Sequence, residues 1–366
     1  MNKILILGGY GNFGRRIAMA LAKSGCSIII AGRHYQKARQ WAKQILSLHP
    51  TATVDVAKID INSTLSEQLT TIRPRVVINT CGPFQQRDYT VAECCLTHSI
   101  HYIDLSDARD YVTCITKLDQ RAKEVGVLIV SGASTVPGLS SAVLEEYKDQ
   151  FSEIESLRYG ISPGQRIDLG LATTQSLLSY IGKPLKPYAG HAKPHGWQQS
   201  YRQRFPDIGQ RWMSTCDVPD LDLLPSRYGI KSIQFSAGME LKLVHGSLWL
   251  LGWLIRLGLP LNLTKFAPAL LRLNRWLDPL GSSNGGMHIN IKGKDHEGAA
   301  KTVDWFIIAK DGDGPQIPTI PAIVLAKKLA ANELNLKGAI PCVGLVSLSD
   351  YLATLTEFNI SVVHQH

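Results

Sequence analysis

The first 33 residues constrain the fold of this chain more than any other stretch. An apolar run at residues 3–7 is followed by a glycine-rich segment, residues 8–14, and then by a helix-favouring segment, residues 15–22. A second apolar run, residues 27–31, ends just before Gly32. This order predicts a strand, a tight turn, a helix and a second strand, which is the unit from which parallel sheets are built.

Three glycines in the turn have the spacing of a dinucleotide-binding loop. Gly9, Gly11 and Gly14 fit the pattern G-x-G-x-x-G. The first allows a tight turn, the second lets backbone approach a pyrophosphate and the third lets helix and strand pack closely, while the helix directs free N–H groups at the phosphates. We expect a dinucleotide site here, and the alternative is a glycine-rich turn in another kind of β-α-β unit. The loop residues assigned to the cofactor site are Gly9, Tyr10, Gly11, Asn12, Phe13 and Gly14.

The end of the second strand indicates which nicotinamide cofactor the site prefers. NAD sites usually have an acid there for the ribose 2′-OH, whereas NADP sites tend to have an arginine for the 2′-phosphate. In this chain Arg33, His34 and Lys37 follow the strand, and no acid occurs between residues 14 and 55. Because a guanidinium binds phosphate and a carboxylate repels it, we expect NADP rather than NAD. The alternative is that these residues are ordinary solvated charges at the start of a helix.

Length and cysteine usage set the broad class of protein. A chain of 366 residues is longer than one core usually supports, so we expect two domains. The seven cysteines are scattered and form no C-x-x-C pair, which favours a reducing, cytoplasmic compartment and argues against a zinc site or any other metal site. The first residues also lack the pattern of a signal peptide.

Strand-like and helix-like segments alternate along the first third of the chain. This alternation predicts a doubly wound parallel sheet of the Rossmann type, with helices on both faces. The predicted strands after the first two are residues 54–60, 76–79, 100–104 and 127–130, and the predicted helices between them are residues 35–48, 65–72, 88–98 and 112–124. Beyond residue 150 the pattern is weaker, with strands expected at 154–162, 288–292 and 298–309, loops and short strands at 183–225, and helices at 168–180, 322–331 and 350–357.

Distinctive loops follow the predicted strands. Residues 79–84 read Asn-Thr-Cys-Gly-Pro-Phe, residues 104–109 read Asp-Leu-Ser-Asp-Ala-Arg, and residues 131–141 are rich in Ser, Gly and Pro. Ligands of such sheets bind at the carboxyl ends of the strands, so we expect these loops to form the functional site. For 79–84 the alternative is a turn that only requires Gly-Pro. The further residues assigned to the cofactor site are Asp60, Asn79, Cys81, Gly82, Pro83, Phe84 and Thr135.

Together these segments resemble a known family. The glycine loop, the turn INTCGPF and the segments HYIDLSDARDYV and SGASTVPGLSSAV are similar to those of the saccharopine dehydrogenase-like (saccharopine reductase-type) oxidoreductases, to about Tyr147. The resemblance implies an NADP-binding Rossmann domain whose last helices come from the C-terminus, and an inserted α+β domain with a mixed sheet that often makes dimer contacts. We therefore assign residues 1–133 and 317–366 to the Rossmann domain and residues 134–316 to an inserted substrate and dimerisation domain, and we expect a homodimer.

The resemblance implies hydride transfer to or from a carbonyl, imine or amine that the sequence does not identify. The nicotinamide carries the hydride, so the protein must orient it and handle one proton. Asp107 and Arg109, after the strand 100–104, are the candidate catalytic residues. Their neighbour Asp104 illustrates the structural alternative, because a carboxylate there can cap the next helix. A second hypothesis is a non-catalytic NADP(H)-binding sensor or a membrane-associated scaffold.

Positive charge is concentrated in the second half of the chain. Residues 186–276 contain 12 Lys and Arg against 5 Asp and Glu, and five of the seven tryptophans, in a chain whose formal net charge is +9. A basic segment of this kind indicates an anionic partner such as a phosphate-bearing ligand or a membrane surface, and the alternative is an ordinary basic surface. No nucleic-acid-binding motif is present, so we expect no nucleic-acid partner.

Residues 244–263 are almost entirely apolar. The uncharged run ends at Arg256 and is shorter than the ~20 residues of a membrane-spanning helix. Three interpretations stay open: a buried or dimer-interface helix pair, a segment lying in a membrane surface with Trp249 and Trp253 as anchors, or the lining of an apolar substrate pocket. Peripheral membrane contact through residues 244–275 is therefore one of the expected partner interactions.

Overall fold

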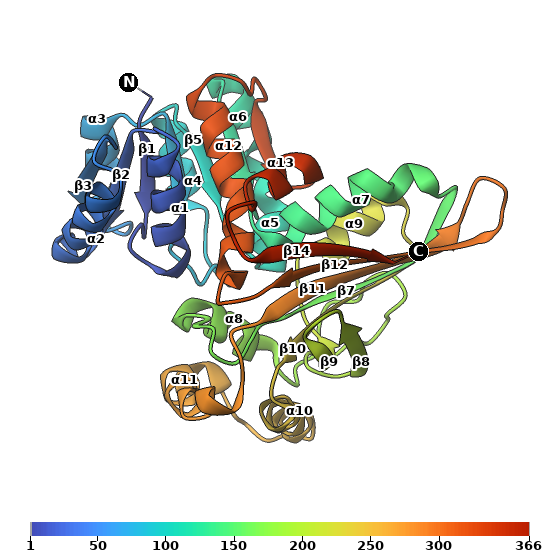
Figure 1. Ribbon diagram of the computed structural model, residues 1–366. Coiled ribbons are helices and arrows are strands. Elements are labelled where there is room, and N and C mark those ends of the chain that lie inside the picture. Colours follow the sequence, from blue (N-terminus) through green and yellow to red (C-terminus); the bar gives the residue numbers. More distant parts are fainter. Residues whose placement is uncertain (1, 366) are drawn as a thin grey trace. The chain divides into compact units, whose positions relative to one another are not determined.

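The computed structural model describes residues 2–365, which form two units (Figure 1). Unit 1 contains the residues up to Ala142 together with Gln316–Thr354. Unit 2 contains Val143–Pro315 together with the residues from Leu355 onward. Residues 1 and 366, the outer ends of the ranges expected from the sequence, lie outside the described part.

Unit 1 is built on a parallel sheet, sheet A, which has seven strands within the described residues. Every neighbouring pair of its strands is parallel, and β1 lies between β4 and β2, where the strand order reverses. This is the doubly wound Rossmann arrangement, and the predicted fold class is confirmed. In spatial order the strands are β13 (Gly338–Pro341), β6 (Leu128–Ser131), β5 (His101–Asp104), β4 (Val76–Asn79), β1 (Ile4–Leu7), β2 (Ile28–Gly32) and β3 (Val54–Lys58).

Helices form a layer on each face of sheet A. α1 contacts α2 and α12, whereas α4 contacts α3 and α6. Strands covered on both faces need no polar side, which explains why β1, β4, β5 and β6 are buried along their whole length. The helices are α1 (Asn12–Lys23), α2 (Tyr35–Leu48), α3 (Leu65–Ile72), α4 (Thr90–Thr97), α6 (Asp119–Val125) and α12 (Ile320–Ala330).

Three elements of unit 1 differ from the sequence prediction. The single helix expected at 112–124 is instead α5 (Arg109–Thr113), a 3-10 turn (Cys114–Leu118) and α6, because β-branched residues at 112, 113, 115 and 116 disfavour a continuous α-helix. The last helix, α13 (Leu348–Ala353), starts earlier than predicted because Ser347 accepts a hydrogen bond from the Asp350 N–H (3.1 Å). Strand β13 was not predicted, since four residues bounded by Gly and Pro carry no periodic signal.

Unit 2 is built on a mixed sheet, sheet B, with seven strands within the described residues. β10 runs parallel to β7, and the other neighbours are antiparallel. In spatial order the strands are β14 (Ile360–Gln365), β12 (Ala300–Ala309), β11 (Gly285–Lys294), β7 (Glu153–Ser162), β10 (Ser232–Met239), β9 (Gly209–Thr215) and β8 (Tyr201–Phe205). The C-terminal strand β14 thus pairs in sheet B, whereas the sequence had placed these residues with the Rossmann domain.

The helices of unit 2 include the apolar segment singled out in the sequence. That segment forms α10 (Lys242–Arg256) and, after a loop, α11 (Ala267–Arg275). Two further helices are α7 (Ser140–Tyr147), which spans the boundary between the units in sequence, and α8 (Leu171–Tyr180). The region 183–225, predicted as loops and short strands, also contains the helix α9 (Asp220–Tyr228). Within residues 2–365 no helix has the length and apolar character needed to cross a membrane.

Candidate functional site

The glycine loop between β1 and α1 has the packing that its sequence pattern requires. A Cβ on Gly14 would lie 2.2 Å from the carbonyl oxygen of Gly8, so any side chain there would push α1 away from the turn. A Cβ on Gly11 would meet only that same oxygen, at 3.1 Å, and nothing else within 4 Å. Gly11 also begins α1 without any side-chain cap, so the first N–H groups of the helix are left for another acceptor.

Tyr10 connects this loop to the basic end of β2. Its ring lies against Gly32, where a Cβ would come within 2.6 Å of the ring, and its hydroxyl accepts a hydrogen bond from the His34 N–H (3.1 Å). The side chains of Arg33, His34 and Lys37 are exposed just beyond this contact. Among residues 2–365 neither Arg33 nor Lys37 has an ion-pair partner.

The loop that follows β4 packs against the glycine loop. The backbone N–H and the hydroxyl of Thr80 both donate to the carbonyl of Leu7, at 3.0 and 2.8 Å. A Cβ on Gly8 would lie 2.6 Å from Oγ1 of Thr80 and 3.2 Å from the Cys81 sulfur. The glycine loop (residues 8–14) and the β4 loop (residues 80–85) are far apart in the sequence, with Leu7 and Thr80 73 positions apart, but they pack together, and we call them the wall.

The pKa of the Cys81 thiol depends on burial and on the charges around this wall. Burial raises the pKa of its thiol to about 11, while the charges of Arg33 and Arg87 lower it and that of Asp60 raises it. The thiol is therefore protonated at neutral pH and is no nucleophile. These influences also place the ends of β2, β3 and β4 within electrostatic range of one another.

Three residues that were assigned to the cofactor site make hydrogen bonds or ring contacts with other residues of the chain. The Asp60 carboxylate accepts from the Asn62 N–H (3.0 Å) and shapes the turn after β3. Asn79 accepts from the Cys81 N–H (3.0 Å) and donates to the Tyr102 hydroxyl (3.1 Å), so both ends of its amide have partners. Phe84 packs against Tyr111, with ring centroids 5.3 Å apart.

Asp104 joins the loops that follow β5 and β6. Its Oδ1 accepts hydrogen bonds from the Ser106 N–H, the Ser131 hydroxyl and the Gly132 N–H, each at 2.9 Å. Complete burial raises the pKa of this carboxyl to about 6, and the three hydrogen bonds lower it in part. Asp104 therefore has a structural role, but it does not cap the next helix as the sequence analysis considered, because α5 starts at Arg109 and has no side-chain cap.

The two candidate catalytic residues lie in different surroundings. Asp107 is partly exposed, and its Oδ1 accepts a hydrogen bond from Nε2 of Gln85 in the loop after β4 (3.1 Å). Arg109, at the start of α5, is only 4% exposed and interacts with other groups of the chain. Thr135, in the loop after β6, is nearly buried at the start of a one-turn helix (Thr135–Leu139).

Some residues of this site were missed by the sequence analysis. Thr80 and Gln85 fix the β4 loop, and Tyr111 meets both the Phe84 ring and, at 3.4 Å, the Tyr102 hydroxyl. Thr80 and Gln85 lie inside or beside a segment that had been singled out, so their position was the available signal. Tyr111 lies in the segment HYIDLSDARDYV that carries the family resemblance, but its contacts come from another strand and loop, so its role was not apparent from the sequence.

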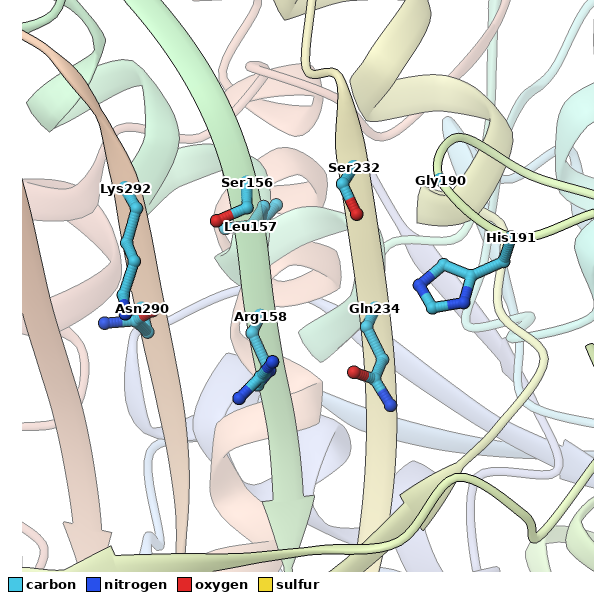
Figure 2. Close-up of a pocket in the computed structure, with 9 residues that line it drawn as sticks. All are labelled: Ser156, Leu157, Arg158, Gly190, His191, Ser232, Gln234, Asn290 and Lys292. Carbon is cyan, nitrogen blue, oxygen red and sulfur yellow. The ribbon is translucent and has the colours of Figure 1, made fainter.

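A second concave site lies on one face of sheet B in unit 2. Figure 2 shows side chains from three neighbouring strands pointing into it, with Arg158 on β7 between Gln234 on β10 and Asn290 on β11. Its volume is about 220 Å³, and Lys292 and His191 also line it. Burial, assisted by the charge of Arg158, lowers the pKa of His191. The sequence did not predict this hollow, because its lining comes from alternate residues of three strands that are far apart in the sequence.

No group of three or more His, Cys, Asp or Glu side chains with the spacing of a metal site occurs in the described part of the chain.

Residues 4–130 match the model of the family described as "Saccharopine dehydrogenase NADP binding domain". This range contains β1 to β5, most of β6 and nearly all of the residues assigned to the cofactor site. No curated protein sequence matches the chain.

Among solved structures, the chain is similar to apo histidine-tagged saccharopine dehydrogenase (L-Glu forming) from Saccharomyces cerevisiae. The two share 12% identity, with a TM-score of 0.67 and full coverage of both chains, which shows a common fold over both units. A short-chain type dehydrogenase/reductase from Mycobacterium ulcerans matches 36% of this chain and 66% of its own, at 14% identity and a TM-score of 0.30. A metagenomic short-chain oxidoreductase in complex with NADP matches 36% of this chain and 81% of its own, at 13% identity and a TM-score of 0.29.

Proposed function

We propose that this chain is an NADP(H)-dependent oxidoreductase, because residues 4–130 match the model of the saccharopine dehydrogenase NADP binding domain. It would transfer a hydride to or from a carbonyl, imine or amine substrate. The observation that carries the proposal is the wall formed by the glycine loop and the β4 loop, beside a strand end whose Arg33 is exposed. The fold is that of the saccharopine dehydrogenase-like oxidoreductases.

The residues of the wall fit the parts of a dinucleotide. The open backbone at Gly11 and the uncapped start of α1 suit the pyrophosphate, which helix N-termini bind through N–H groups. Arg33 and Lys37, with no carboxylate beside them in sequence, suit a 2′-phosphate better than a ribose hydroxyl. Tyr10 connects the glycine loop to the end of β2, since it contacts Gly32 and His34.

The nicotinamide supplies or accepts the hydride when the cofactor is bound. Of the carboxylates after β5, Asp104 is buried and holds two loops, whereas Asp107 is partly exposed and hydrogen-bonded to Gln85. Asp107 is therefore the better candidate for proton transfer, and Arg109 is proposed as a residue that positions the same segment. Retention of the loops after β4, β5 and β6 favours an enzyme over a sensor or scaffold.

The test is a fluorescence titration of the purified protein with NADPH and with NADH. We expect NADPH to bind more tightly, and Arg33→Asp to remove that preference, because a carboxylate would repel the 2′-phosphate. Lys43→Asp, which changes an exposed charge on α2, the helix that follows Arg33, but farther from the glycine loop, is the matched control and should keep the preference. Equal binding of NADH by the unaltered protein would overturn the NADP assignment, and binding of neither cofactor would overturn the enzyme proposal.

We also propose a cytoplasmic homodimer. None of the seven cysteines, all within residues 2–365, forms a disulfide, which supports a reducing compartment. The resemblance of the mixed sheet to one that often makes dimer contacts supports the dimer. Light scattering on the purified protein should give twice the chain mass of 40.3 kDa.

A further inference from the structure

Exposed apolar side chains are concentrated in one part of unit 2. Ten large apolar side chains between residues 243 and 280 are more than a third exposed, and only six others are found in the remaining described chain. A monomeric protein rarely leaves such side chains together in water without a binding role. We name these ten the α10–α11 surface: Leu243, Trp249, Leu250, Leu254, Leu257, Leu259, Phe266, Leu273, Trp276 and Leu280.

Helix α10 is mostly apolar but is covered on one side only. On its inner side His245 is hydrogen-bonded to Ser214 (2.9 Å). Gly252 on the same side packs closely on Gly182, since a Cβ on Gly182 would lie 2.3 Å from the Gly252 carbonyl oxygen. On its outer side Leu243, Leu250, Leu254 and Leu257 recur at helical spacing, and all are exposed. The covered side already stabilises the helix, so the outer leucines are not needed for its packing.

Helix α11 repeats this arrangement. Its inner residue Ala267 is completely buried, and α11 packs on α8. Phe266, Leu273 and Trp276 lie on its outer side at intervals of seven and three residues, and each is more than half exposed. Figure 1 shows α10 and α11 at the periphery of unit 2.

The charges of this region have one dominant sign. Between residues 242 and 280 five Lys and Arg stand against the single acid Asp278, a difference of +4, and all five cations are exposed. Arg256 lies over the Trp253 ring at 5.0 Å, and Trp253 meets Trp249 edge to face at 6.1 Å. The five cations are Lys242, Arg256, Lys265, Arg272 and Arg275, of which Arg275 also approaches Asp168 (3.5 Å).

We propose that the α10–α11 surface docks on the surface of an anionic lipid bilayer. Leucines with tryptophans among lysines and arginines form the pattern of a segment that lies at the boundary of head groups and acyl chains. The excess of cations over acids complements anionic lipid, whereas a neutral protein partner would not need it. Helix α10, at 15 residues, extends roughly 22 Å and so lies on the bilayer without spanning its ~30 Å core.

Sedimentation of the full-length protein with vesicles tests this proposal. We expect binding to vesicles of phosphatidylcholine with phosphatidylglycerol, little binding to phosphatidylcholine alone, and release when salt is raised from about 0.1 M to about 1 M. Reversing Lys265 and Arg272 to Glu should weaken binding by at least tenfold, since each cation contributes about fivefold near such a surface. Lys43→Glu with Lys337→Glu, the same charge change on unit 1, is the control and should reduce binding far less.

The apolar part is tested with Leu257→Ser combined with Trp276→Ser. These side chains are 78% and 77% exposed, so the fold should not depend on them. We expect at least tenfold weaker vesicle binding, because a buried leucine or tryptophan contributes that much or more. Leu46→Ser with Leu48→Ser, exposed leucines on α2, should bind vesicles like the unaltered protein.

Three outcomes would overturn the proposal. One is no sedimentation with anionic vesicles; another is equal, salt-independent binding to neutral vesicles. The third combines two results: the unaltered protein binds no vesicles, and light scattering shows that the Leu257/Trp276 variant has lost a dimer. The α10–α11 surface would then be a contact between copies of the chain. NADPH titration of the same variants should be unchanged in every case, so a failure of the cofactor assignment is recognised separately.

Discussion

The β-α-β unit at residues 4–33 and the α10–α11 region have similar composition but opposite exposure. Both are rich in aliphatic residues and contain several basic ones, although isoleucine prevails in the first and leucine in the second. In the first, strand residues Ile4 to Leu7 are at most 1% exposed, whereas Leu257 and Trp276 of the second are more than three-quarters exposed. A strand inside a doubly wound sheet is covered on both faces, but a helix packed on one side of a unit keeps an uncovered side. Apolar composition therefore does not by itself predict burial.

Truncating a leucine in each region should give the largest contrast. Leu5→Ala removes a completely buried side chain of the sheet A core and should lower the free energy of unfolding by about 4 kcal/mol, whereas Leu257→Ala should change it by less than about 0.5 kcal/mol. Urea unfolding of the two variants measures both values. A large loss for Leu257→Ala would mean that this side chain is covered in solution.

The same substitution at two helical glycines should have effects of opposite sign. Gly14→Ala would place a Cβ 2.2 Å from the Gly8 carbonyl and should destabilise by about 2 kcal/mol and weaken NADPH binding. Gly246→Ala, on the uncovered side of α10 with nothing within 4 Å, should stabilise by about 0.5–1 kcal/mol because alanine is the better helix former. Thermal unfolding and NADPH titration are the measurements, and tolerance of Gly14→Ala would disprove the tight packing of helix on turn.

Acid should weaken both units through buried histidines. Burial lowers the pKa of His101 on β5 and of His245 on α10 to about 4, below the ordinary value of 6.5. The unfolded chain then binds more protons than the folded one below pH 6.5, so stability is complete above that pH and falls toward pH 4. The limit is about 1.4 kcal/mol per pH unit for each ring, and solvent access reduces it. Urea unfolding at pH 7 and pH 5, repeated with His101→Asn and His245→Asn, should show a smaller pH effect in each variant.

Local sequence determined much of the Rossmann unit. The spacing of Gly9, Gly11 and Gly14 predicted the turn, and helix α2 has the predicted bounds, since these features depend on neighbours in the chain. Strand β14 and the hollow around Arg158 were not predictable in this way. They depend on pairing between strands that are far apart in sequence, and no local pattern encodes such pairing.

The candidate site shows the same division. Arg33 and the glycine loop could be assigned from sequence because strand, turn and helix follow directly on one another. The roles of Asn79, Asp104 and Tyr111 emerged only when β4, β5 and β6 lay side by side, so that one side chain met the next strand or its loop. The sequence likewise showed that residues 244–275 are apolar and basic. Only the tertiary structure decided which side of α10 is covered, because burial depends on what packs against a helix and not on the helix alone.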